Sequence, residues 1–113
     1  MRQAKSITAL SAVTTGTSNA YAINDMDRVG LTCQWASGVT AGVVVLEAAP
    51  AQDYTGTWNA LVTLNVTGAG TPPSIQASAV EVVGLFVRAR VTTTVSGGGS
   101  PSVTAIIDMS RRS

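Results

Sequence analysis

A chain of 113 residues with 12% charged side chains has the size of one compact domain and about half the usual share of charge. Its seven basic and six acidic residues are scattered and give a net charge of +1, which excludes the basic surface that a nucleic-acid partner requires. The sequence has no histidine and one cysteine, Cys33, which excludes an internal disulfide and the common zinc sites.

Short strand patterns alternate with turn-forming clusters along the chain, and no segment keeps the 3.6-residue period of a helix. About eight short strands are predicted, at residues 4–13, 20–24, 28–36, 42–49, 57–66, 75–83, 85–95 and 102–109. This spacing is typical of an antiparallel β-sandwich, a jelly roll or a small barrel. We expect an all-β fold in a single β-sandwich domain over residues 1–113, with residues 1–14 as an N-terminal arm or first strand and no second domain.

The N-terminal segment has some features of a secretory signal. Arg2 and Lys5 precede a weakly apolar run, and Ala20-Tyr21-Ala22 matches the small-residue pattern of a signal-peptidase site. Serines and threonines interrupt the apolar run, so we expect no signal peptide. No run approaches the roughly 18 apolar residues that cross a bilayer, so no membrane partner is expected.

Several predicted strands carry apolar residues at every second position, as half-buried strands do. The predicted inward rows are Leu31-Cys33-Trp35, Trp58-Ala60-Val62-Leu64-Val66 and Leu85-Val87-Ala89-Val91. The run from Val43 to Leu46 is apolar on both faces, which suits a central strand covered on both sides or a strand at a subunit contact.

Two polar clusters are predicted to be turns. Asn24-Asp25-Met26-Asp27 offers alternate oxygen ligands for Ca²⁺ but lacks the glycine and the distal glutamate of a helix-loop-helix calcium site. The tract Gly97–Gly99 stands between two predicted strands, so we expect a hairpin loop there. Because no helix or lysine follows the tract, it does not resemble a phosphate-binding loop. We expect neither a metal nor another cofactor.

The sequence predicts no enzyme. Without histidine, the common serine and cysteine triads cannot form. Glu47, Asp53 and Glu81 could supply a pair of catalytic carboxylates, but each is predicted beside a strand end or on a solvent-facing side. A small-molecule ligand is not expected either.

Trp35, Tyr54 and Trp58 could form an aromatic platform for sugar rings. Both tryptophans lie in the apolar phase of their strands, however, where a large ring usually fills the core. We therefore expect both tryptophans in the core and Tyr54 exposed at a loop tip.

Phe86, Arg88 and Arg90 alternate with the core positions of their strand and project from its other face. Arginine and aromatic residues are enriched in protein interfaces, so we expect these three residues and Tyr54 to contact a partner. A solvated face is the alternative. Because the core lies on the opposite side, alanine at Arg88 and Arg90 is expected to weaken partner binding and to leave folding intact. The low charge also predicts a dimer, a trimer or a larger lattice of copies.

The central and C-terminal part of the chain carries a series of strand and turn motifs in a characteristic order. They are Gly42-Val43-Val44-Val45-Leu46-Glu47, Asp53-Tyr54-Thr55-Gly56-Thr57-Trp58, Val87-Arg88-Ala89-Arg90-Val91, the glycine tract and Val103-Thr104-Ala105-Ile106-Ile107. In this order, over residues 42–107, the chain resembles small β-sandwich structural proteins of tailed bacteriophages, of the kind that decorate or cement the head.

The resemblance implies a virion structural protein without enzymatic activity, present in symmetric copies. Its implied role is a capsid cement or decoration subunit on the outer capsid surface, made in the host cytoplasm, with the major capsid protein and copies of itself as partners. Similar patterns occur in tail and fibre components. The alternatives are therefore a tail-fibre or surface module that binds a carbohydrate or receptor, and a tail or connector subunit.

Overall fold

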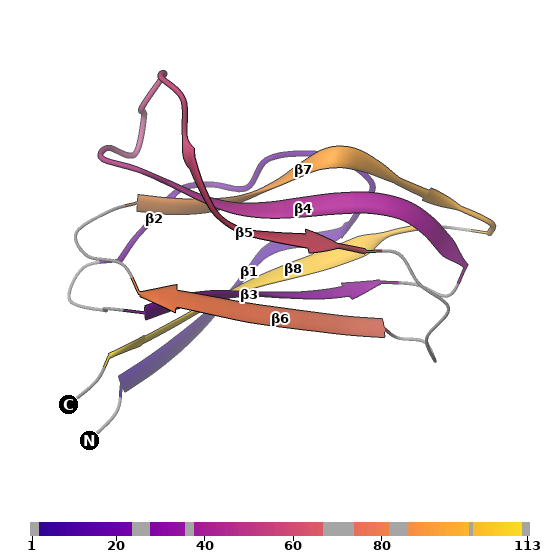
Figure 1. The fold of residues 1–113 in the computed structure, drawn as a ribbon, viewed down its shortest axis with the longest axis horizontal. Helices are drawn as coiled ribbons and strands as arrows, with labels where there is room; N and C mark the ends of the chain where they lie inside the picture. Colours follow the sequence, from indigo (N-terminus) through magenta and orange to yellow (C-terminus); the bar gives the residue numbers. More distant parts are fainter. Residues whose placement is uncertain are drawn as a thin grey trace.

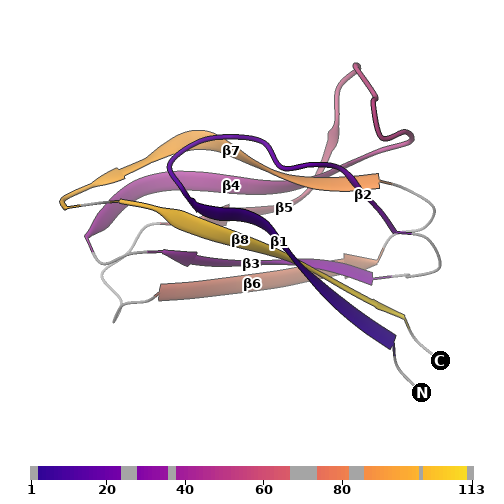
Figure 2. The ribbon, with the colours of Figure 1, turned by 180° about the vertical axis from the view of Figure 1, so that it is seen from behind.

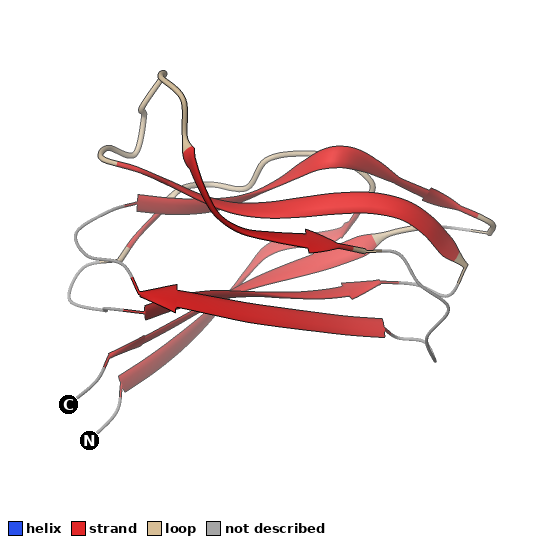
Figure 3. Cartoon of the chain, viewed as in Figure 1, coloured by secondary structure: helices blue, strands red, loops and turns tan. Residues whose placement is uncertain are grey.

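The computed structural model describes residues 3–23, 28–35, 38–66, 74–81, 86–99 and 101–111. These residues form antiparallel strands and loops without a helix (Figure 3), so no helix in the described part of the chain could cross a membrane. The strands are β1 (Gln3–Val13), β2 (Tyr21–Ala22), β3 (Arg28–Trp35), β4 (Val39–Ala49), β5 (Asn59–Asn65), β6 (Ser74–Glu81), β7 (Phe86–Gly97) and β8 (Val103–Arg111). The predicted all-β class is confirmed. The predicted strand ends at residues 24, 36, 82–83 and 85 lie outside the described residues.

The strands form two stacked sheets (Figures 1 and 2). The first sheet has the order β1-β8-β3-β6 and the second has the order β2-β7-β4-β5. The pairing is nested: β1 pairs with β8, β2 with β7, β3 with β6, and β4 with β5. A long hairpin wrapped into two sheets in this way is the jelly roll, one of the three forms predicted from the strand spacing.

The core lies between the two sheets. Leu31, Cys33 and Trp35 of β3 are all buried in it, as their alternation predicts. The central position predicted for the apolar run in β4 is confirmed, because β4 lies between β7 and β5. Val44 and Leu46 point into the core, and other members of the core cluster include Val62, Leu64, Val87, Ala89, Val103 and Ile107.

The N-terminal part of the chain contributes to both sheets. After Val13 the chain leaves β8 and runs along the outer edge of β7, where three backbone hydrogen bonds hold it: Val95 N–H to Thr14 O (2.8 Å), Val91 N–H to Gly16 O (2.9 Å) and Ser18 N–H to Ala89 O (2.8 Å). The chain then enters β2, which contains two residues of the Ala20-Tyr21-Ala22 pattern. This segment therefore closes the edge of the second sheet.

The glycine tract is not a hairpin loop, and that prediction is wrong. Strand β7 belongs to the second sheet and β8 to the first, so the tract crosses from one sheet to the other. At its start, the N–H of Gly98 donates to the carbonyl oxygen of Gly38, at 3.2 Å. Glycine suits both kinds of turn, and the local sequence does not specify which sheet the next strand joins.

Trp58 is buried, as predicted, but it does not belong to the core cluster of Val62 and Leu64, in which the alternation predicted it. Leu46 is opposite Val62 but Glu47 is opposite Ala60, so Leu61 forms a β-bulge. An extra residue reverses the alternation beyond it, because side chains alternate between faces at every residue. The bulge therefore places Trp58 on the outer face of the second sheet.

Candidate interaction site

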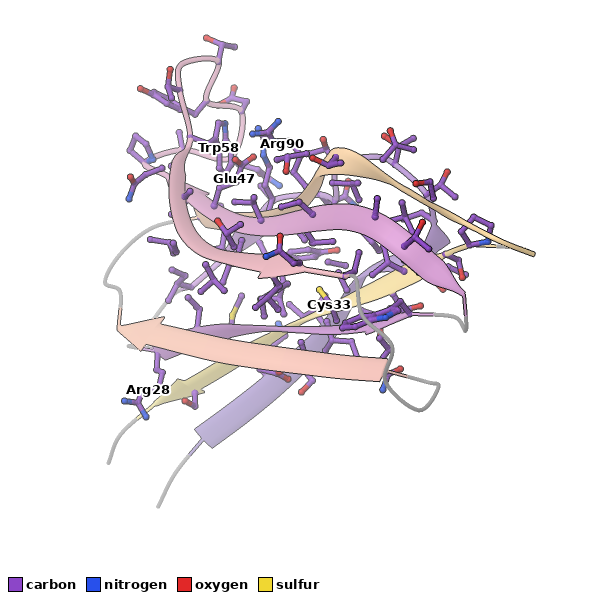
Figure 4. All side chains as sticks on the ribbon, turned by 45° about the vertical axis from the view of Figure 1, so that its right-hand side comes forward. Arg28, Cys33, Glu47, Trp58 and Arg90 are labelled. Atoms are coloured by element: carbon purple, nitrogen blue, oxygen red, sulfur yellow. The ribbon has the colours of Figure 1, made fainter. Side chains whose placement is uncertain are left out.

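Glu47 and Arg90 project from the outer face of the second sheet (Figure 4), and Arg88 is directly opposite Glu47 on the neighbouring strand. Glu47 lies on β4, opposite Arg88 of β7, and Arg90 lies one outward position further along β7. Val87 and Ala89 alternate with the arginines and point into the core, as predicted, which directs the arginines outward. Side chains directly opposite each other on neighbouring strands are close enough to interact.

Both arginines bind the carboxylate of Glu47. Arg88 Nε donates to Glu47 Oε1 at 2.7 Å, and Arg90 donates to Oε1 through Nε (3.0 Å) and to Oε2 through Nη2 (3.3 Å). Glu47 is 1% exposed, so the predicted solvent-facing position is wrong, whereas its predicted position near a strand end agrees with the end of β4 at Ala49. A buried carboxylate is stable only when it is paired and hydrogen-bonded, and the two arginines supply both conditions.

The guanidinium group of Arg88 also lies over an aromatic ring. Its central carbon is 4.0 Å from the centroid of the Trp58 ring, which is within the range of a cation–π interaction. The side chain of Arg88 is 25% exposed and that of Arg90 is 43% exposed. We call Glu47, Trp58, Arg88 and Arg90 the arginine cluster.

The loop formed by residues 50–58, which joins β4 to β5, rises from the second sheet (Figure 1), next to the labelled side chains of Glu47, Trp58 and Arg90 (Figure 4). The indole N–H of Trp58 donates to the carbonyl oxygen of Tyr54 at 2.9 Å, and the N–H of Tyr54 donates to the carbonyl oxygen of Ala51 at 3.3 Å. Tyr54 is 38% exposed, which confirms its predicted exposure on this loop. The loop is thus connected through Trp58 to the arginines of β7.

The four residues predicted to contact a partner lie on the same side of the molecule. Tyr54 and Arg88 both contact the Trp58 ring, and Arg90 joins them through Glu47. Phe86 precedes Arg88 and Arg90 on β7. It occupies an outward position, as they do, and is half-buried. Their contact with another protein stays a prediction.

Two members of the cluster, Glu47 and Trp58, are not among the residues that the sequence predicts at an interface. The alternation of β4 could have placed Glu47 on the face opposite Leu46, but it gives no information about which strand lies beside β4. The site also changes one expectation. Alanine at both Arg88 and Arg90 would leave Glu47 buried without its partners, so folding should not remain intact.

The other candidate groups do not assemble into a second site. Trp35 lies in the core, so the three aromatic residues do not share a platform. Asp53 is exposed on the 50–58 loop, and no group of three potential metal ligands occurs among the side chains that the structure describes. Asp25 and Asp27, and the side chain of Glu81, lie outside that description.

Cys33 is buried on the inner face of β3. Burial disfavours the charged thiolate and raises the pKa of Cys33 to about 12. At neutral pH the residue is therefore a neutral, apolar member of the core and not a reactive thiol.

Comparison with known proteins shows the fold. No family model matches the chain, and no curated protein matches it. The chain is similar to the crystal structure of the SPBc2 prophage-derived protein YomS, with a TM-score of 0.60, 18% identity, and coverage of 97% of this chain and 95% of that one. It is also similar to Eiger TNF from S. frugiperda, with a TM-score of 0.51, 12% identity, and coverage of 97% and 85%. The chain therefore shares a β fold with a prophage-derived protein along nearly the whole length of both.

Proposed function

We propose that this protein is a structural subunit of a bacteriophage particle, and specifically a cement or decoration subunit on the outer capsid surface. One observation carries the proposal: the fold is similar to a prophage-derived protein over 97% of this chain and 95% of that one. A jelly roll is also an architecture that viral capsid proteins use. The phage-like order of motifs in residues 42–107 supports the same assignment.

In this proposal the docking surface is the outer face of the second sheet, formed by the arginine cluster and the 50–58 loop. Tyr54 is the one large apolar side chain that is exposed among the described residues, and it stands beside two partly exposed arginines. Tyrosine and arginine are enriched among the few residues that dominate the binding energy of protein interfaces. The major capsid protein and further copies of this chain are the proposed partners.

The positions of the aromatic rings favour a protein partner over a sugar. A carbohydrate platform needs several exposed rings, but Trp35 is in the core and Trp58 is buried beneath Arg88. A sugar-binding tail-fibre module would have to bind through Tyr54 alone. We therefore rank a tail-fibre or receptor-binding module below the cement subunit, with a tail or connector subunit as the other alternative.

Co-sedimentation with phage particles that lack this protein tests the proposal. We expect wild-type protein to bind in a fixed ratio to the major capsid protein, and Tyr54→Ala to bind about tenfold or more weakly while folding normally. Thr8→Ala, an exposed position on β1 of the first sheet, is the matched control and should bind as wild type does. A folded wild-type protein that does not bind particles would refute the proposal.

A further inference from the structure

We propose that the arginine cluster binds one acidic side chain of a neighbouring protein subunit, through the N–H groups of Arg88 and Arg90 that Glu47 does not use. The inference rests on the function proposed above, because it names the chemistry of the partner at the same face. It commits to a protein carboxylate, and a phosphate or a sugar at this site would contradict it.

The cluster has a surplus of one positive charge, because two guanidinium groups share the single carboxylate of Glu47. The other acidic side chains described do not neutralise this charge. Asp108 belongs to the first sheet, where it accepts hydrogen bonds from Ser6 Oγ (2.6 Å) and Thr32 Oγ1 (3.0 Å). Asp53 is exposed and makes no ion pair with either arginine. An external anion is therefore the natural complement.

The unused donors have the geometry that a carboxylate needs. A guanidinium group carries five N–H donors in a plane. Among the described contacts, Arg88 uses Nε, and Arg90 uses Nε and Nη2, so both Nη groups of Arg88 and Nη1 of Arg90 remain for a partner. Two such donors can bind the two oxygens of a carboxylate side by side.

The cluster also holds these donors in place before binding. The Trp58 ring lies under the Arg88 guanidinium, and Glu47 fixes Nε of both arginines. Less side-chain freedom is then lost on binding, which improves affinity. A single surplus charge matches one carboxylate, whereas a nucleic-acid backbone would bring several phosphates to a face that also displays Asp53.

Four proteins test the inference by varying the surplus charge. Wild type has two arginines and one glutamate, a surplus of one. Arg90→Gln removes the surplus, Glu47→Gln raises it to two, and the double variant Glu47→Gln/Arg90→Gln restores it to one. Each protein is melted to measure its stability and then titrated onto particles that lack it. A second arm uses particles whose carboxylates have been converted to neutral amides with carbodiimide and glycinamide.

We expect particle affinity to follow the surplus charge. Arg90→Gln should bind about tenfold or more weakly than wild type, the double variant should recover most of that loss, and Glu47→Gln should bind at least as well as wild type. On amidated particles, wild type should fall to the level of Arg90→Gln. If Arg90→Gln does not fold, the comparison of Glu47→Gln with wild type and the amidated particles decide the question.

Three outcomes would overturn the inference. Affinity that follows melting temperature instead of charge would show that the cluster only stabilises the fold. Binding that survives amidation, or that is lost after nuclease or sugar-removing treatment, would assign another anion. In these cases wild-type protein still binds particles, so the proposed function stands. Absence of wild-type binding would overturn the proposed function together with this inference.

Discussion

The indole N–H of Trp58 donates a 2.9 Å hydrogen bond to the carbonyl oxygen of Tyr54, four residues earlier in the chain. The two rings also meet edge to face, with centroids 6.5 Å apart. These contacts connect Tyr54 to Trp58 within the 50–58 loop. The guanidinium carbon of Arg88 lies 4.0 Å from the centroid of the Trp58 ring. One tryptophan thus joins the loop to the arginine cluster.

The first prediction follows from this role of Trp58. Trp58→Phe removes the hydrogen bond to Tyr54 and weakens the cation–π contact with Arg88. We expect the free energy of unfolding to fall by about 1–2 kcal/mol and cleavage within the 50–58 loop by protease to become faster. Urea unfolding and limited proteolysis measure the two effects.

Trp35→Phe is the matched control, because the buried indole N–H of Trp35 has no hydrogen-bond partner among the described residues. This variant loses ring volume from the core but no hydrogen bond, and it should not change cleavage within the loop. Equal cleavage rates for wild type and Trp58→Phe would contradict the role assigned to Trp58.

The second prediction concerns the buried carboxylate. Arg88→Ala/Arg90→Ala leaves Glu47 without its ion-pair partners, so we expect a loss of roughly 3–5 kcal/mol in the free energy of unfolding. Adding Glu47→Leu should recover part of this loss, since an apolar side chain needs no partner. Urea unfolding of the three proteins gives the values. A double variant within about 1 kcal/mol of wild type would show that water or another group satisfies Glu47.

The third prediction concerns Cys33 and alkaline pH. Burial raises its folded-state pKa from 9.0 to about 12, whereas in the unfolded chain the thiol ionises near 9.0. Below pH 9.0 the thiol is protonated in both the folded and the unfolded state, so it does not affect stability. Between pH 9.0 and about 12 only the unfolded state loses the proton. Stability should therefore fall by about 1.4 kcal/mol per pH unit between these two pKa values.

Cys33→Ala should lack this component, so the difference in unfolding free energy between wild type and variant is measured at several alkaline pH values. A difference that stays constant up to pH 11 would contradict the raised pKa. In native protein at pH 8, Cys33 should also resist thiol reagents until the chain unfolds.

The fourth prediction compares two neighbouring glycines. A Cβ atom at Gly97 would collide with the carbonyl oxygen of Gly38 and lie 2.9 Å from Val39 Cα, so Gly97→Ala should cost about 2–3 kcal/mol. At Gly98 nothing lies within 4 Å of the added atom, so Gly98→Ala should leave stability nearly unchanged. Thermal melts compare the variants. Equal melting temperatures would show that β4 and β7 can separate at this point.

Local alternation predicts the strands and much of the core, because a strand with one buried face carries apolar residues at every second position. The inward row of Leu31, Cys33 and Trp35 is an example. The alternation does not predict the bulge at Leu61, which moves Trp58 to the other face of the sheet. The bond between Glu47 and Arg88 depends on β4 lying beside β7, which is a long-range pairing that alternation does not encode. The arginines could therefore be predicted as an outward pair, but not their carboxylate.

The nested pairing of the strands has a consequence for how the protein folds. Among the described strands, only β4 and β5 are neighbours both in sequence and in a sheet, and each other sheet pair joins strands that are distant in the sequence. Contacts between distant segments close slowly, so we expect a slow folding reaction that begins near the β4–β5 hairpin. Strand β1 has no sheet partner until β8 has emerged from the ribosome. During synthesis its edge is consequently open to aggregation, and a chaperone that covers β1 should raise the yield of folded protein.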